Sequence, residues 1–128
     1  VTELVKICNK NAKYIVQPKV LSYWDRNIID SVGGLYTKWG FGFNLGSKED
    51  DHGQYENNRQ IDYAYGSIFM TKRSFFNEVG GFDPWFKGYY EDVDLSLRAK
   101  AQGGAIWYCY KALAYHKISL TYKKYQRF

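Results

Sequence analysis

Apolar residues recur along the chain in short runs separated by glycine and polar residues, a pattern that predicts short helices and strands in alternation. Helical spacing begins at Leu4, and the apolar run over residues 14–16 predicts a buried strand that Pro18 ends. A second short strand is expected over residues 28–32. Residues 35–58 are rich in glycine and aromatic residues, and we expect an irregular excursion or loose hairpin at the domain edge.

The second half of the chain has stronger element signals. Alternation over residues 61–70 predicts a strand, in which Gly66 and Ser67 permit close approach of a ligand or another backbone. Thr71 is the expected cap of a helix that ends at Gly80, a residue suited to the left-handed conformation of a helix end.

Residues 91–102 fit either a strand or a helix by period. An acidic start, a basic end and a following glycine pair favour a helix, on which Asp94 and Arg98 have ion-pair spacing. Two apolar runs after it predict strands, the second of which leads to His116. This alternation of elements predicts an α/β fold.

Composition bounds the protein to one domain of 128 residues with an unusual aromatic share of 20%. The surplus of rings fits a saccharide or nucleic-acid site, although most rings are expected in the core. The net charge is +5, and the basic residues are scattered until the segment from Lys117 to Arg127. This segment is a candidate for peripheral contact with an anionic membrane, but a solvated terminus is the favoured interpretation. Cys8 and Cys109 lack metal-site spacing, so buried thiols in a reducing compartment are expected.

Candidate chemistry centres on Glu91, Asp92 and Asp94, three carboxylates within four positions behind an aromatic segment. Neighbouring carboxylates repel and apolar surroundings disfavour their charged forms, so one of them can accept a proton near neutral pH, as a general base must. A solvated acidic helix start has the same spacing, and the spacing leaves both open. For the acidic group around His52, an exposed turn is favoured over a cation site because nothing fixes its ligands.

An ordered series of motifs resembles the family 2 glycosyltransferases, particularly the rhamnosyltransferase-like enzymes of bacterial and archaeal polysaccharide synthesis. The series comprises Ile61-Asp62-Tyr63, Gly66, Lys72-Arg73, Val79-Gly80-Gly81-Phe82-Asp83, Tyr90-Glu91-Asp92-Val93-Asp94-Leu95, Arg98 and Tyr115-His116. The resemblance implies the C-terminal half of a GT-A fold, a Rossmann-like mixed sheet with flanking helices.

The resemblance also implies inverting transfer of a sugar from a nucleotide-diphospho-sugar to a saccharide or lipid-linked acceptor. Asp92 is then the base, Glu91 supports it or holds the acceptor, and His116 is a ligand of Mg²⁺ or Mn²⁺. Asp94 and Arg98 form a structural pair by the same analogy. The aromatic segment ahead of the base adds Trp85, Tyr89 and Tyr90 to the acceptor side, together with Gly66 and Ser67.

The family's Asp-x-Asp motif is expected before residue 1, since none stands early in this chain and its only Met is Met70. We therefore expect residues 1–128 to be a partial catalytic domain whose nucleotide-binding half lies upstream, inactive alone and without a tightly bound metal. The expected location is the cytoplasm or the inner face of the cell membrane, with no nucleic-acid partner. The rival hypotheses are a non-catalytic carbohydrate- or nucleic-acid-binding module and an inactive structural fragment.

Overall fold

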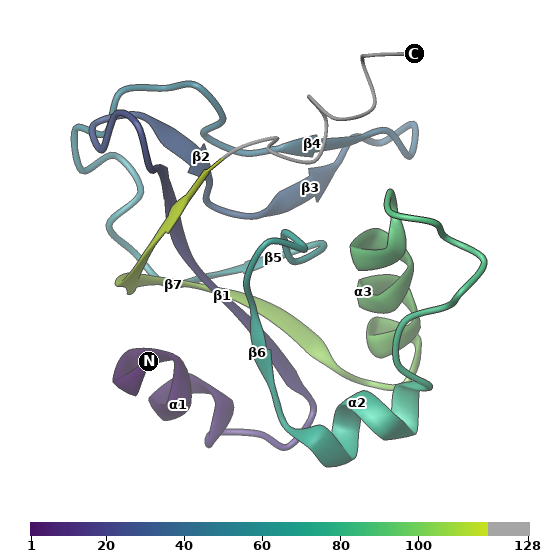
Figure 1. Ribbon diagram of the computed structural model, residues 1–128. Coiled ribbons are helices and arrows are strands. Elements are labelled where there is room, and N and C mark those ends of the chain that lie inside the picture. The colour runs from purple at the N-terminus through teal and green to yellow at the C-terminus, as the bar shows by residue number, and fades with distance from the viewer. Residues whose placement is uncertain (118–128) are drawn as a thin grey trace.

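Two long parallel strands, β1 (Tyr14–Ser22) and β7 (Ala105–His116), form the centre of the molecule in the computed structural model, which describes residues 1–117 (Figure 1). On the far edge of β1, β6 (Met70–Thr71) and β2 (Ile29–Ser31) pair antiparallel with its two halves. On the far edge of β7, β5 (Arg59–Ile61) pairs antiparallel. A separate hairpin joins β3 (Gly34–Tyr36) to β4 (Gly42–Asn44). The predicted mixed sheet of an α/β fold is confirmed, and so is a hairpin within 35–58.

Pro18 lies inside β1 and does not end it, contrary to the sequence prediction. The register with β7 moves from Pro18 opposite Cys109 to Lys19 opposite Leu113, so residues 110–112 bulge from β7. Proline has no N–H to donate, and it is accommodated where the ladder is interrupted. The same bulge separates the two apolar runs expected as two strands, which belong to one strand.

Buried apolar residues form one cluster on each face of the sheet, because neighbours such as Ile15 and Val16 point to opposite sides. Helices α2 (Arg73–Val79) and α3 (Glu91–Ala101) contribute to the larger cluster, through Phe75, Val79, Leu95 and Ala99. Helix α1 (Thr2–Cys8) covers the other face, where Cys8 and Cys109 are both buried and free (Figure 1). The expected buried thiols are confirmed.

Helix α2 ends as predicted at Gly80, which is left-handed with φ 96°, and Phe82 folds back onto Phe76 with ring centroids 5.4 Å apart. Thr71 is not its cap: Lys72 holds that position, and the Thr71 hydroxyl donates to the Tyr14 carbonyl at 2.9 Å. Because this hydroxyl bonds β6 to β1, it is not free to cap the helix.

The segment over 91–102 is the predicted helix, α3, and Arg98 joins it to the end of α2. Arg98 pairs with Asp94 at 2.6 Å and also donates to the carbonyls of Val79 at 2.7 Å and Gly81 at 2.8 Å. The predicted structural ion pair is therefore confirmed. Among the residues described, no helix is long and apolar enough to cross a bilayer; α3 has 11 residues.

Candidate functional site

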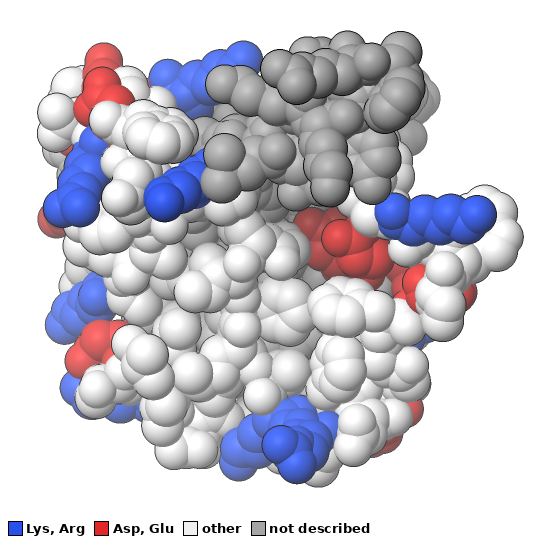
Figure 2. Space-filling view, in the orientation of Figure 1, with Lys and Arg blue, Asp and Glu red and all other residues white. Residues whose placement is uncertain are grey.

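A hollow of about 380 Å³ opens at the N-terminal end of α3 and brings distant parts of the chain together. In Figure 2, red carboxylate surface gathers over this end of α3. Of the eight residues predicted from the sequence, all but Trp85 line the hollow; its full lining is Tyr65, Gly66, Ser67, Gly88, Tyr89, Tyr90, Glu91, Asp92 and His116. The hollow thus joins the start of α3, the end of β7 and the segment after β5.

Asp92 is held in the hollow through both oxygens of its carboxylate. Oδ1 accepts the N–H of Val93 at 2.8 Å, and Oδ2 accepts the N–H of Gly66 at 2.8 Å. A Cβ on Gly66 would lie 3.0 Å from Oδ2, so glycine is what permits this approach. A carboxylate oxygen has two lone pairs, so each oxygen keeps one for a further partner.

The expected strand over 61–70 is wrong in its middle, because three consecutive backbone N–H groups there donate to side chains. Ala64 donates to Ser96 Oγ at 3.1 Å, Tyr65 to Gln17 Oε1 at 2.6 Å, and Gly66 to Asp92. Of residues 61–70, only the first, Ile61, belongs to β5, and only the last, Met70, belongs to β6. The segment is thereby attached to α3 and β1 instead of pairing as a strand.

Glu91 begins α3 beside Asp92 and has a buried, unpartnered oxygen. Its Oε2 has no hydrogen-bond partner among residues 1–117. The preceding residue, Tyr90, takes a left-handed backbone conformation with φ 68°, which is costly for a residue with a side chain and is found mostly where the surroundings enforce it. A buried polar atom without a partner costs free energy, which a hydrogen-bond donor that reached it would recover.

Two tyrosines near Asp92 stay protonated far above neutral pH. Burial, followed by the charge of Asp92, raises the pKa of Tyr63 to about 12. Burial, followed by the charge of Asp30 and a hydrogen bond to it, raises the pKa of Tyr65 to about 12. Tyr65 lines the hollow and Tyr63 lies outside its lining, and neither hydroxyl adds negative charge near Asp92 at neutral pH.

His116 lies at the end of β7, where it is oriented by a buried carboxylate. Its Nδ1 is 2.8 Å from Oδ2 of Asp30, a β2 residue only 7% exposed, and its ring meets Tyr65 edge-on at 5.8 Å. Such a contact fixes the ring and leaves Nε2 for another partner. Among the described residues, no three His, Cys, Asp or Glu side chains are grouped to hold a metal ion.

Trp85 lies outside the hollow, in a second depression of about 840 Å³ that shares Tyr89 and Tyr90 with it. The exposed fractions of these residues are 80% for Trp85, 69% for Tyr89 and 71% for Tyr90. Trp85 packs edge-on against Phe86, with ring centroids 5.5 Å apart. The aromatic segment therefore presents its rings to solvent beside the carboxylates and does not fill the core.

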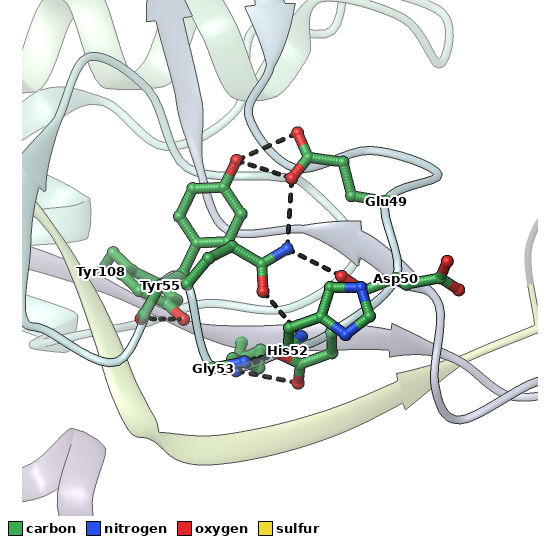
Figure 3. A network of polar contacts seen from close by, with 9 residues as sticks. Glu49, Asp50, His52, Gly53, Tyr55 and Tyr108 are labelled. Carbon is green, nitrogen blue, oxygen red and sulfur yellow. Dashed lines mark hydrogen bonds and ion pairs between the residues drawn. The ribbon is translucent and has the colours of Figure 1, made fainter.

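The acidic turn around His52 is held by contacts within the protein (Figure 3). Tyr55 donates to Glu49 at 3.0 Å, and Gly53 donates to Asp51 Oδ1 at 3.2 Å. Asp51 also accepts Lys19 Nζ at 2.9 Å, a lysine only 3% exposed. These contacts agree with the turn favoured from the sequence.

Asp30 and Gln17 are the site residues that the sequence reasoning missed. Both are polar residues within apolar strands, and both are buried, at 7% and 0% exposed. A buried polar side chain needs partners, which these find in His116 and in the Tyr65 N–H. The interruption of an apolar run by one polar residue was the available signal.

Comparison with known proteins gives a family match over residues 1–127, to the model described as glycosyl transferase family group 2. The low-salt glycan biosynthesis hexosyltransferase Agl10 of Haloferax volcanii is 31% identical over 64 residues, covering 50% of this chain and 21% of the relative. The N-acetylglucosaminyl-diphospho-decaprenol L-rhamnosyltransferase of Mycobacterium tuberculosis is 38% identical over 64 residues, covering 49% of this chain and 21% of the relative. The matched part is thus about one fifth of the length of these relatives. Because the match covers residues 1–127 of its 128 residues, the chain belongs to glycosyl transferase family group 2.

Proposed function

We propose that this chain is the acceptor side of a glycosyltransferase in which Asp92 is the general base. Family membership supports sugar transfer in general. The observation that carries the finer proposal is the placement of Asp92 in the hollow, with each carboxylate oxygen fixed by one backbone N–H and able to accept one more proton donor.

In the proposed reaction, an acceptor hydroxyl gives its proton to Asp92 as its oxygen attacks the anomeric carbon of the donor sugar. The new carbon–oxygen bond forms while the bond from that carbon to the diphosphate breaks, and the diphosphate leaves with the electron pair. Attack from the side opposite the leaving group inverts the anomeric configuration. A positioned base of this kind typically contributes about 100- to 10,000-fold in rate.

Glu91 is proposed to hold the acceptor through its buried, unpartnered Oε2. A sugar hydroxyl that donated a hydrogen bond to this oxygen would give it a partner, and would orient the neighbouring hydroxyl toward Asp92. Trp85, Tyr89 and Tyr90 are proposed to border the acceptor, because exposed rings stack on the C–H faces of sugars. The backbone at Gly66 and Ser67 closes the hollow from the other side.

His116 is the residue of this chain proposed to hold a divalent ion, Mg²⁺ or Mn²⁺. Its orientation by Asp30 suits a metal ligand, and the described residues contain no group of three or more His, Cys, Asp or Glu side chains that could complete a site. When bound, such an ion neutralises the charge on a departing diphosphate. The remaining ligands are expected from the upstream half and the donor.

The proposed partners are a nucleotide-diphospho-sugar and a saccharide or lipid-linked acceptor. The name of the Mycobacterium tuberculosis relative refers to a sugar carried on a lipid diphosphate, which supports the lipid-linked alternative. A cytoplasmic place at the inner membrane face is proposed for the same reason. The expected contact through the basic tail concerns mainly residues 118–128, which lie outside the described part.

The experiment is product analysis with the full-length protein that contains this chain. Inversion of the anomeric centre, measured by NMR of the product, together with loss of turnover in Asp92→Asn, supports the proposal. Retention of configuration would overturn the mechanism. Saccharide binding without turnover by the full-length protein would instead favour the non-catalytic binding module.

A further inference from the structure

A compact surface of aromatic and basic side chains lies at the β1–β2 turn and the end of β7. We name this set, Tyr23, Trp24, Arg26, Tyr115 and Lys117, the turn patch. Its members contact one another: Tyr23 meets Trp24 edge-on at 5.1 Å, Arg26 lies 4.5 Å over the Tyr115 ring, and Lys117 lies 4.5 Å over the Tyr23 ring. None of them lines the hollow.

The aromatic side chains of the turn patch are exposed to solvent. Trp24 is 70% exposed, and Tyr23 and Tyr115 are 41% and 44% exposed. An exposed tryptophan beside two exposed tyrosines is a typical mark of an interaction surface, because large rings gain free energy when they leave water. The cations held on the ring faces restrict the partner to one that tolerates fixed positive charge.

We propose that the turn patch contacts the head-group layer of an anionic phospholipid membrane. Tryptophan and tyrosine have an apolar body and a polar edge that suit the boundary between head groups and acyl chains. Arg26 and Lys117 complement anionic head groups. Asp25, the one acidic residue in the turn, accepts the Asn27 N–H at 3.1 Å and keeps its negative charge. Two cations against this one carboxylate favour an anionic surface over a neutral glycan.

The position of the patch gives this contact a consequence for the site. The Tyr23 N–H donates to the His116 carbonyl at 2.9 Å, so the patch and the site share the end of β7. Side chains alternate along a strand, so Tyr115 points to the face opposite His116. In Figure 1 the β1–β2 turn lies at the upper left, and α3 lies on the opposite side of the view. A membrane bound by the patch would therefore lie at the His116 side of the hollow without filling it.

The test measures partitioning of the full-length protein onto phosphatidylcholine vesicles with and without phosphatidylglycerol. Wild type should bind the anionic vesicles more tightly, and added salt should weaken that binding. Arg26→Gln/Lys117→Gln should lose about 25-fold in affinity, at about 5-fold for each removed charge, and only on anionic vesicles. Trp24→Ala should weaken binding to both vesicle types. Trp39→Ala is the matched control, because Trp39 is 75% exposed and lies outside the patch.

The proposal is overturned if wild type ignores the charge of the vesicles, or if the patch variants bind as wild type does. An equal loss in Trp39→Ala would place the contact elsewhere and overturn it too. Patch variants that lose saccharide binding but keep vesicle binding would assign the patch to a glycan. Patch variants that lose self-association but keep vesicle binding would assign it to a second copy of the protein. The inference goes beyond the proposed transfer function: the patch variants should retain turnover with a water-soluble acceptor, so a failed membrane proposal is distinguishable from a failed catalytic one.

Discussion

The Oδ2 atom of Asp92 accepts a 2.8 Å hydrogen bond from the N–H of Gly66, a residue 26 positions earlier in the chain. This contact joins the start of α3 to the segment after β5, the two parts of the chain that line most of the hollow. It also makes the absence of a side chain at residue 66 a condition for the placement of the proposed base.

Gly66→Ala should lower kcat while leaving the fold intact. The new Cβ would lie 3.0 Å from Asp92 Oδ2 and 3.2 Å from its Cβ, which is tighter than nine in ten real contacts, so the carboxylate must give by a few tenths of an ångström. A displacement of a few tenths of an ångström can cost ~10-fold or more in rate. Turnover of full-length enzyme and its thermal midpoint would be compared with those of Ser74→Ala, an exposed position on α2. Wild-type kcat in a folded Gly66→Ala enzyme would contradict the proposed role of this contact.

Asp92→Asn should reduce turnover by about 100- to 10,000-fold, because an amide cannot take up the acceptor proton. Asp94→Asn is the matched control two positions away on the same helix. It loses the 2.6 Å pair with Arg98 and should lower stability while preserving turnover in the folded fraction. Equal turnover in the two folded variants would remove Asp92 from the base role.

Tyr89→Ala should raise the KM for the acceptor far more than the KM for the donor. The ring is 69% exposed and lines both depressions, so its removal takes away contact area without opening the core. Initial rates at varied acceptor and donor give the two constants in one preparation. A parallel rise in both would point to a general disturbance of the segment before α3.

Asp30→Asn should raise the half-saturating concentration of Mn²⁺ or Mg²⁺ by about 10- to 100-fold, the usual effect of losing the carboxylate that orients a metal-ligating histidine. His116→Ala should raise it at least as much. Direct Mn²⁺ binding by the full-length protein, followed by electron paramagnetic resonance, gives a measure besides turnover. Asp25→Asn, an exposed position in the turn between β1 and β2, is the control. Unchanged metal dependence in His116→Ala would show that His116 is no ligand.

Asp51→Asn should cost up to about 3 kcal/mol in the free energy of unfolding at neutral pH, because it leaves buried Lys19 without its partner. Burial alone would raise the pKa of Asp51, but hydrogen bonds from Lys19 and Gly53 lower it below 3.8 overall. A lowered pKa means that the stabilisation is complete above pH 3.8 and is lost as the pH falls below it. Denaturant unfolding across this range should therefore show the difference from wild type shrinking in acid.

Asp50→Asn, in the same turn but exposed, is the control for that experiment and should change stability by less than about 0.5 kcal/mol. A pH-independent difference between Asp51→Asn and wild type would mean that packing, and not the Lys19 contact, causes the loss.

Local sequence signals predicted the parts of the fold that depend on neighbours in the chain. The helix over 91–102 and the glycine end of α2 follow from charge and backbone preferences within each segment. Pro18 shows where such signals fail, because a bulge in β7, about ninety positions away, is what accommodates it inside β1. Thr71 fails similarly, since the Tyr14 carbonyl claims its hydroxyl.

The candidate site also contains residues that local sequence signals predicted and residues that they did not. Asp92 and Glu91 were identifiable from their spacing and motif, and the structure brings them together with Gly66, Ser67 and His116. Asp30 was not identifiable, because its role depends on β2 beginning at the end of the sheet where β7 ends. A residue whose function is to orient another is visible only when the tertiary contact is known.

The three N–H groups of residues 64–66 that donate to Ser96, Gln17 and Asp92 also bear on local unfolding. A surface segment normally opens without disturbing its neighbours, and its amide protons exchange quickly with solvent. Here each opening must break contacts to α3 and β1, so we expect the segment to open together with its partners in these two elements. We therefore expect the amide protons of residues 64–66 to exchange as slowly as those of a strand, although these residues belong to none.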